Sequence, residues 1–111
     1  MRKDDAYLLD ILLAARKVLK YTKGMKQEEF DGSEIVQDAV MRQLEILGEA
    51  AGHISEEFRR KHPTIPWHKI IGLRNQIIHE YFRVNRQIVW DTIQNDLPDF
   101  IRLIEPLVPA E

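Results

Sequence analysis

Chemically active side chains are grouped between residues 74 and 81, where Arg74, Asn75, His79 and Tyr81 lie close together in the chain. Arginine stays charged in proteins and offers several N–H donors to a phosphate group. Histidine titrates near neutral pH, so it can donate or accept a proton. An arginine and a histidine in one cleft would therefore bind a phosphate and move a proton at the same place.

The apolar residues around this segment recur at intervals of three and four, which predicts an amphipathic helix from Pro66 to about Tyr81. Arg74 falls inside the apolar stripe of this helix. An unpaired charge there would be costly, so we expect a carboxylate partner. The candidate carboxylates are Asp38, Glu45 and Glu49.

A purely structural interpretation of these residues is available. Arg74 would pair with one of these carboxylates in the core. His79 would hydrogen-bond a carbonyl at the helix end, where the helix dipole favours a cation. Tyr81 would be a core aromatic residue with its hydroxyl at the surface.

A functional interpretation competes with the structural one. Residues five apart on a helix differ in direction by roughly 140°, so Arg74 and His79 need not touch within one chain. If Arg74 met its twin across a two-fold axis, two arginines and two histidines would surround one cleft. Such a cleft suits cleavage of an RNA phosphodiester. His79 would deprotonate the 2′-hydroxyl or protonate the leaving oxygen, and Arg74 would offset the charge that develops on the phosphorane. This chemistry requires no metal.

Helical periodicity also dominates the remainder of the chain, and no strand-like alternation is present. We predict an all-α fold, in which residues 1–111 form one up-and-down bundle of four main helices plus one or two short helices. The apolar faces are wide for a chain of 111 residues, which favours a homodimer. The main helices are expected at 5–21, 34–53, 66–81 and from Asn85 onward, and the short ones at 25–30 and 55–62.

Local signals refine these boundaries. Ser33 and Asn85 are suited to cap helices, and Gly24 to end one in a left-handed conformation. Pro98 should kink or interrupt the last helix. The pair Gly48 and Gly52 leaves room for a close helix approach. The predicted apolar face of residues 34–53 comprises Ile35, Val36, Ala39, Val40, Leu44, Ile46, Leu47, Ala50 and Ala51.

The overall charge gives no attraction toward nucleic acid, because the formal net charge is -2. Any RNA contact must come from a local patch, and Arg42, Arg83 and Arg86 are the candidates. The basic run at 59–62 is better explained as a solvated helix face. At 44% hydrophobic and 31% charged, the sequence has the composition of a folded domain.

Several classes of site are disfavoured. The chain has no cysteine, which excludes disulfides and thiolate chemistry. His62 and His68 lack partners for a zinc site, so no metal is expected. The start of the chain lacks the apolar stretch of a signal peptide, and no run is long enough to span a membrane. These features fit a cytoplasmic protein.

The pattern Arg74-Asn75-x-x-x-His79-x-Tyr81 resembles the R-x-x-x-x-H-x-Y signature of the HEPN superfamily. Other segments, in the same order, resemble the HepT-like toxins of two-gene toxin–antitoxin systems. Together they cover nearly the whole chain. They are Leu9-Asp10-Ile11-Leu12, Tyr21-Thr22-Lys23-Gly24-Met25, Ala39-Val40-Met41-Arg42, Leu47-Gly48-Glu49-Ala50, Pro66-Trp67, Val89-Trp90 and Asp96-Leu97-Pro98.

This resemblance implies a homodimeric, metal-independent endoribonuclease with its cleft at the dimer interface and no cofactor. Arg74 and His79 would be catalytic and Asn75 supportive. Tyr81 matches the position that the partner, a minimal nucleotidyltransferase acting as antitoxin, modifies with AMP. The partner would bind the homodimer, alone or in a higher complex.

Two other roles remain open. Some relatives are described as non-catalytic companions of nucleotidyltransferases that bind a nucleotide or substrate. A purely structural dimer is the third alternative.

Overall fold

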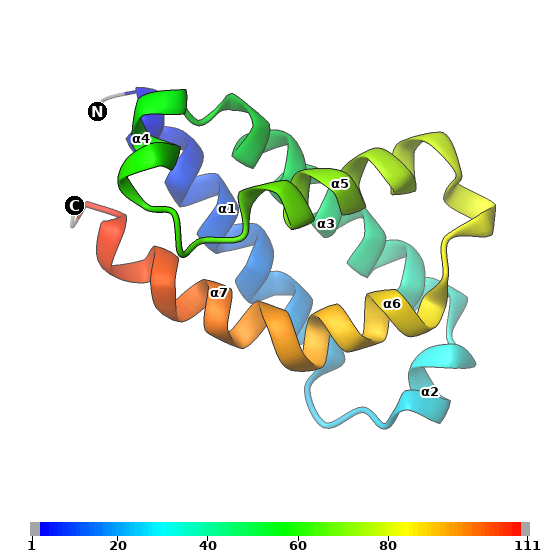
Figure 1. Cartoon of the computed structure of the whole chain (residues 1–111). Helices are drawn as coiled ribbons and strands as arrows, with labels where there is room; N and C mark the ends of the chain where they lie inside the picture. Colours follow the sequence, from blue (N-terminus) through cyan, green and yellow to red (C-terminus); the bar gives the residue numbers. More distant parts are fainter. Residues whose placement is uncertain (1–2, 110–111) are drawn as a thin grey trace.

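Helices make up all the regular secondary structure in residues 3–109, the part of the chain that this computed structural model describes (Figure 1). The predicted all-α class is therefore confirmed for this part. The predicted domain limits, residues 1 and 111, lie outside the described residues. The elements are α1 (Lys3–Thr22), α2 (Gln27–Asp31), α3 (Glu34–His53), α4 (Glu56–Lys61), α5 (Trp67–His79), the 3-10 helix η1 (Tyr81–Arg83), α6 (Arg86–Asp91), the π-helix η2 (Thr92–Asp96), α7 (Leu97–Ile104) and the 3-10 helix η3 (Glu105–Leu107).

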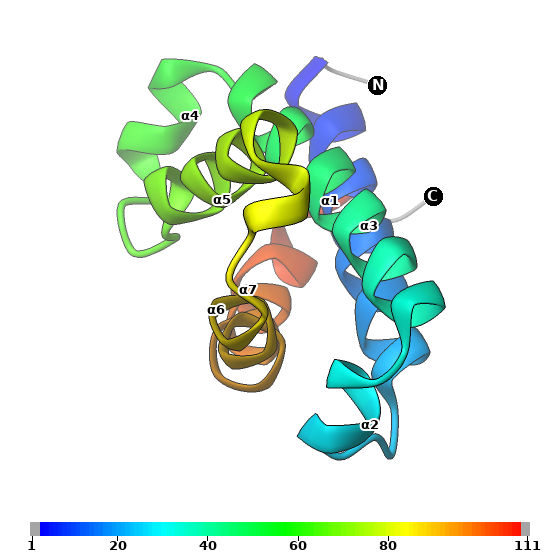
Figure 2. The same cartoon turned by 90° about the vertical axis from the view of Figure 1, so that its right-hand side faces the viewer.

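The long helices reverse direction in turn, as expected of an up-and-down bundle (Figure 1). Helices α1 and α3 pack against each other, α5 packs on α3, and α7 returns against α1. Viewed end on, α5 and the continuous run from α6 to α7 lie on the same side of the α1–α3 pair (Figure 2). None of the described helices is long and apolar enough to cross a membrane. The core between them includes Leu8, Ile11, Val18, Val40, Leu47, Ile77, Ile93, Phe100 and Ile104.

Side-chain hydrogen bonds and one glycine conformation set three helix ends at the positions predicted from the sequence. The Ser33 hydroxyl accepts a hydrogen bond from the backbone N–H of Val36 at the start of α3. The Asn85 side chain accepts from two N–H groups of α6. Gly24 follows α1 with a φ of 76°, a conformation that favours glycine. All three predictions are confirmed.

The last long helix is interrupted before Pro98. Proline lacks a backbone N–H, and its ring clashes with the carbonyl four residues earlier in an α-helix. The chain widens into the π-helix η2 over residues 92–96, and Pro98 then lies in the first turn of α7. Both halves of the helix keep an apolar side in the core, including Val89 and Phe100. The predicted interruption is confirmed.

Helix α5 comes closest to α3 at Gly48. A Cβ atom on this glycine would lie 2.2 Å from the Cβ of Arg74 and 3.1 Å from the carbonyl oxygen of Ile70. The close approach predicted for Gly48 is confirmed. The same prediction is wrong for Gly52, since a Cβ there would meet nothing within 4 Å.

The predicted apolar face of α3 was also too wide. Ile35 is 84% exposed, whereas Val40 is fully buried. The two residues are five apart, so on a helix they point in directions roughly 140° apart and cannot both face the core.

We expect Gly48→Ala to destabilise the fold by about 1–3 kcal/mol, because the new methyl group would push α5 away from α3. The matched control is Gly52→Ala on the same helix. With open space around it, that substitution should be neutral, or stabilising by up to about 1 kcal/mol through helix propensity. Urea unfolding of both variants measures the difference, and equal stabilities would contradict the packing argument.

Candidate functional site

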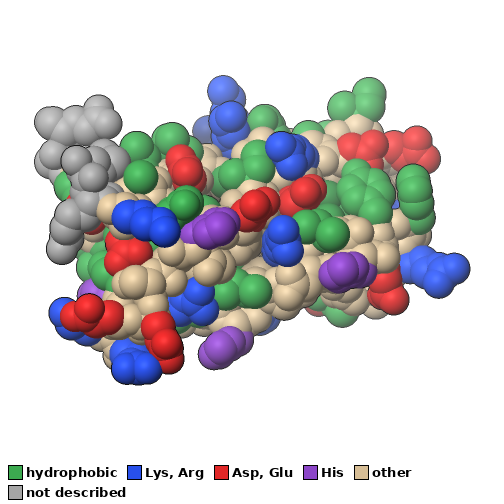
Figure 3. Space-filling view, turned by 90° about the horizontal axis from the view of Figure 1, so that it is seen from above, with side chains coloured by type: hydrophobic (Ala, Val, Ile, Leu, Met, Phe, Trp, Pro, Cys, Tyr) green, Lys and Arg blue, Asp and Glu red, His purple; other side chains and the backbone are tan. Residues whose placement is uncertain are grey.

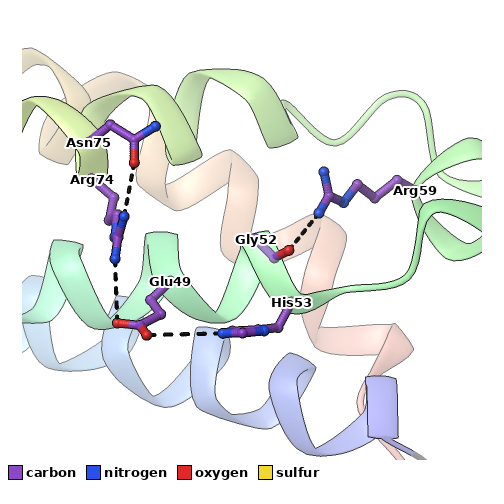
Figure 4. Close-up of polar contacts among 6 residues, drawn as sticks. All are labelled: Glu49, Gly52, His53, Arg59, Arg74 and Asn75. Carbon is purple, nitrogen blue, oxygen red and sulfur yellow. Dashed lines mark hydrogen bonds and ion pairs between the residues drawn. The ribbon is translucent and has the colours of Figure 1, made fainter.

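Arg74 is held between α5 and α3 (Figure 4). Its aliphatic carbons lie against Gly48, and its side chain is 28% exposed. One terminal nitrogen, Nη2, lies 3.8 Å from Glu49 Oε2, and the other, Nη1, donates to Asn75 Oδ1 at 3.0 Å. The expected carboxylate partner is therefore Glu49, chosen from the three candidates.

The Arg74 guanidinium is not fully paired by these neighbours. Its Nε atom is buried and has no hydrogen-bond partner within residues 3–109. A buried donor without an acceptor typically costs about 1–3 kcal/mol. The Nη2 atom of Arg74 meets Glu49 only in a loose ion pair at 3.8 Å and makes no hydrogen bond among the described residues, so this nitrogen keeps the capacity to bind an anion.

Glu49 links Arg74 to a second basic side chain (Figure 4). Its other oxygen, Oε1, lies 4.0 Å from His53 Nε2, and the His53 ring stacks on Tyr7 with ring centroids 5.1 Å apart. His53 is a residue of this site that sequence reasoning missed. Its spacing of four residues from Glu49 places the two side chains on one face of α3, and this spacing could have indicated their contact.

These residues surround a shallow hollow of about 190 Å³. It is lined by Gly48, Glu49, Gly52, His53, Ile71, Arg74 and Asn75. Arg74 and Asn75 thus line one hollow, where a phosphate could meet the guanidinium.

His79 is placed apart from this hollow. It ends α5, its side chain is exposed, and that side chain makes no hydrogen bond or ion pair within the described residues. The structural interpretation, a hydrogen bond from His79 to a carbonyl at the helix end, is therefore wrong. One chain holds Arg74 in place and leaves the imidazole of His79 free.

Tyr81 lies in η1, directly after α5, and contacts α3. Its hydroxyl donates a hydrogen bond to Asp38 Oδ1 at 2.6 Å. Burial and this hydrogen bond, in that order of size, raise the pKa of Tyr81 from 10.0 to about 12. The phenol consequently stays protonated over the whole neutral range.

A second hollow, also of about 190 Å³, adjoins this hydrogen bond. Tyr81, Asp38, Glu34 and Arg86 are among its lining residues. Phe82 also lines it, is 98% exposed, and meets the Tyr81 ring edge-on, with centroids 5.3 Å apart.

The candidate RNA-contacting arginines are all exposed. Arg42 lies 3.5 Å from Glu45, and Arg86 is 3.5 Å from the carbonyl oxygen of Asp31. The Arg83 side chain makes no polar contact within residues 3–109. On the face viewed in Figure 3, positive and negative side chains alternate and no single basic patch forms.

In the basic run at 59–62, Arg60 and Lys61 lie on a solvated helix face as predicted, whereas Arg59 contacts the end of α3. Arg59 donates to the carbonyl oxygens of Gly52 and Ile54 at the end of α3, at 2.8 and 3.2 Å. Arg60 and Lys61 form ion pairs with glutamates one turn earlier on α4. Separately, the described residues contain no group of three or more His, Asp or Glu side chains arranged to hold a metal ion.

Comparison with known proteins identifies the relatives of this chain. The family model described as "Ribonuclease HepT-like" matches residues 11–107. A protein of Methanocaldococcus jannaschii, provisionally named an RNase, is 39% identical over 90% of this chain and 92% of its own length. A Thermococcus cleftensis protein, provisionally named ribonuclease HepT, is 37% identical over 96% of both chains. No solved structure matches significantly.

The raised pKa of Tyr81 gives a measurable expectation. The fold favours the neutral phenol, so its stabilising effect should be complete below about pH 10 and be lost as the pH rises toward 12. Absorbance titration of the phenolate should show a late-ionising group that is absent in Tyr81→Phe. In Asp38→Asn the same group should ionise at lower pH, and an unchanged curve would contradict the assigned hydrogen bond.

Proposed function

Since the chain belongs to the HepT-like ribonuclease family, we propose that it is a metal-independent endoribonuclease whose cleft forms between two copies of the chain. The observation that carries this proposal is the contrast between Arg74 and His79. Arg74 is fixed by Glu49 and Asn75, whereas the side chain of His79 is exposed and unpartnered among the described residues. Phosphodiester cleavage needs a cation held in place to bind the phosphate and a group that is free to transfer a proton.

Each residue has a defined role in this proposal. Arg74 binds the scissile phosphate and offsets the charge that develops on it. His79 takes the proton of the 2′-hydroxyl or gives one to the leaving oxygen. Asn75 orients the guanidinium through its 3.0 Å hydrogen bond. The exposed Arg42, Arg83 and Arg86 contact the RNA backbone on either side.

The second copy of the chain would supply the histidine that the hollow beside Arg74 lacks within one chain. Within one chain, His79 does not line the hollow beside Arg74. The apolar residues Ile78 and Phe82, which flank His79 in sequence, are 40% and 98% exposed. A two-fold contact over these residues would bury their apolar area and bring both histidines to one cleft.

We further propose that the protein is the toxin of a type II toxin–antitoxin system in the cytoplasm. Its antitoxin would be a minimal nucleotidyltransferase that transfers AMP to Tyr81. Tyr81 lies two residues after His79, so the added phosphate would introduce a bulky anion close to the cleft.

The main alternative is a non-catalytic companion that binds a nucleotide or substrate for a nucleotidyltransferase. The hollow beside Arg74 supports anion binding without cleavage equally well. Binding that depends on Arg74, together with an absence of cleavage, would favour this alternative.

Cleavage of RNA in EDTA tests the catalytic proposal. We expect wild type to cut, and His79→Ala to lose about 10²–10⁴-fold in rate because the proton carrier is gone. His68→Ala is the matched control, since His68 is exposed on the same helix and should matter little. An inert wild type, or a fully active His79→Ala, would refute catalysis by this residue.

Light scattering tests the shared cleft. We expect twice the 13.1 kDa mass of one chain at micromolar concentration. Refolding an Arg74→Gln chain together with a His79→Ala chain should restore cleavage, because the mixed dimer keeps one intact arginine and one intact histidine. A monomer, or mixtures as inactive as the single variants, would exclude a site built from two chains.

A further inference from the structure

We propose that Asp38 is the catalytic base for the modification of Tyr81, accepting the phenol proton as the tyrosine oxygen attacks a nucleoside triphosphate. This inference rests on the proposed neutralisation by AMP transfer. It names a residue of this chain, outside the signature segment, that would act in that reaction. Its basis is the 2.6 Å hydrogen bond from the Tyr81 hydroxyl to Asp38 Oδ1.

Tyr81 needs a base because its hydroxyl does not ionise by itself. With a pKa of about 12, the phenolate fraction at pH 7 is on the order of 10⁻⁵. The hydrogen bond to Asp38 favours the neutral phenol before reaction. Once the oxygen begins to bond to phosphorus, its basicity falls, and the proton can move along the existing hydrogen bond to the carboxylate.

The reaction balances with a nucleoside triphosphate as the co-reactant, held by the nucleotidyltransferase. A bond forms between Tyr81 Oη and the α-phosphorus. The bond from the α-phosphorus to the bridging oxygen breaks, and pyrophosphate leaves with the electron pair. The phenol proton passes to Asp38 and then to solvent.

The surroundings of the hydrogen bond allow a phosphate to approach. Tyr81 and Asp38 both line the hollow of about 190 Å³ between η1 and α3. Glu34 and Asp38 add negative charge to this hollow, and Arg86, which also lines it, adds a positive charge. The Arg86 guanidinium would offset part of the charge on the incoming phosphate.

A structural role for Asp38 makes a different prediction from a catalytic one. Asparagine has nearly the same shape as aspartate, and its side-chain carbonyl can still accept the Tyr81 hydrogen bond. Asp38→Asn therefore preserves the contact between η1 and α3 but cannot take up the proton. Asp38→Glu keeps the basic group at a slightly different distance.

The test is a single-turnover assay of the full chain with saturating cognate nucleotidyltransferase and ATP, followed by intact mass and peptide mapping. Wild type should gain AMP on Tyr81, and Tyr81→Phe should gain none. Asp38→Asn should react about 10²-fold more slowly or worse, with an unchanged melting temperature. Asp38→Glu should recover part of the rate.

Glu34→Gln is the matched control, since Glu34 lines the same hollow without bonding the hydroxyl. Removing this negative charge should not slow the reaction, and an equal loss in Glu34→Gln and Asp38→Asn would overturn the inference. Equal rates for wild type and Asp38→Asn would overturn it too, leaving AMP transfer intact. A wild type that gains no AMP on Tyr81 would overturn the proposed neutralisation and this inference together.

Discussion

Helix α5 lies so close to α3 at Gly48 that a Cβ there would come within 2.2 Å of the Cβ of Arg74. This contact fixes where α5 sits, and the positions of the candidate functional residues follow from it. It places the Arg74 guanidinium beside Glu49, the next residue on α3. It also directs the end of α5 along α3, so that Tyr81 reaches Asp38.

Helix α3 thus supplies a carboxylate to Arg74 of α5 and another to Tyr81 of η1. Glu49 lies 3.8 Å from the Arg74 guanidinium, and Asp38 accepts the Tyr81 hydroxyl at 2.6 Å. The two pairs differ in kind. The first leaves the charge of Arg74 in place for a phosphate, while the second depends on one phenol proton, which modification of Tyr81 would remove.

The sequence was sufficient for features that depend on neighbouring residues, such as the caps at Ser33 and Asn85 and the interruption before Pro98. It was insufficient for features that depend on how two helices pack against each other, such as burial and contacts between helices. Periodicity marks an apolar stripe without saying how much of it a neighbour covers, which explains the error at Ile35. In the site, the sequence offered Glu49 as one of three possible partners of Arg74, but the choice of Glu49 and the bond between Asp38 and Tyr81 depend on contacts between residues distant in sequence.

The exposed position of His79 has an evolutionary consequence. Replacing Gly48 or the half-buried Arg74 disturbs the packing of α5 on α3, so selection for a folded chain opposes such changes. His79 has no side-chain partner in the described part of the chain, and the fold does not oppose its loss. Under the proposed mechanism, mutation at this one position would give a stable descendant that still holds an anion at Arg74 but does not cut RNA. A binding companion and a nuclease of one lineage would then differ by a single substitution that does not change the stability of the fold.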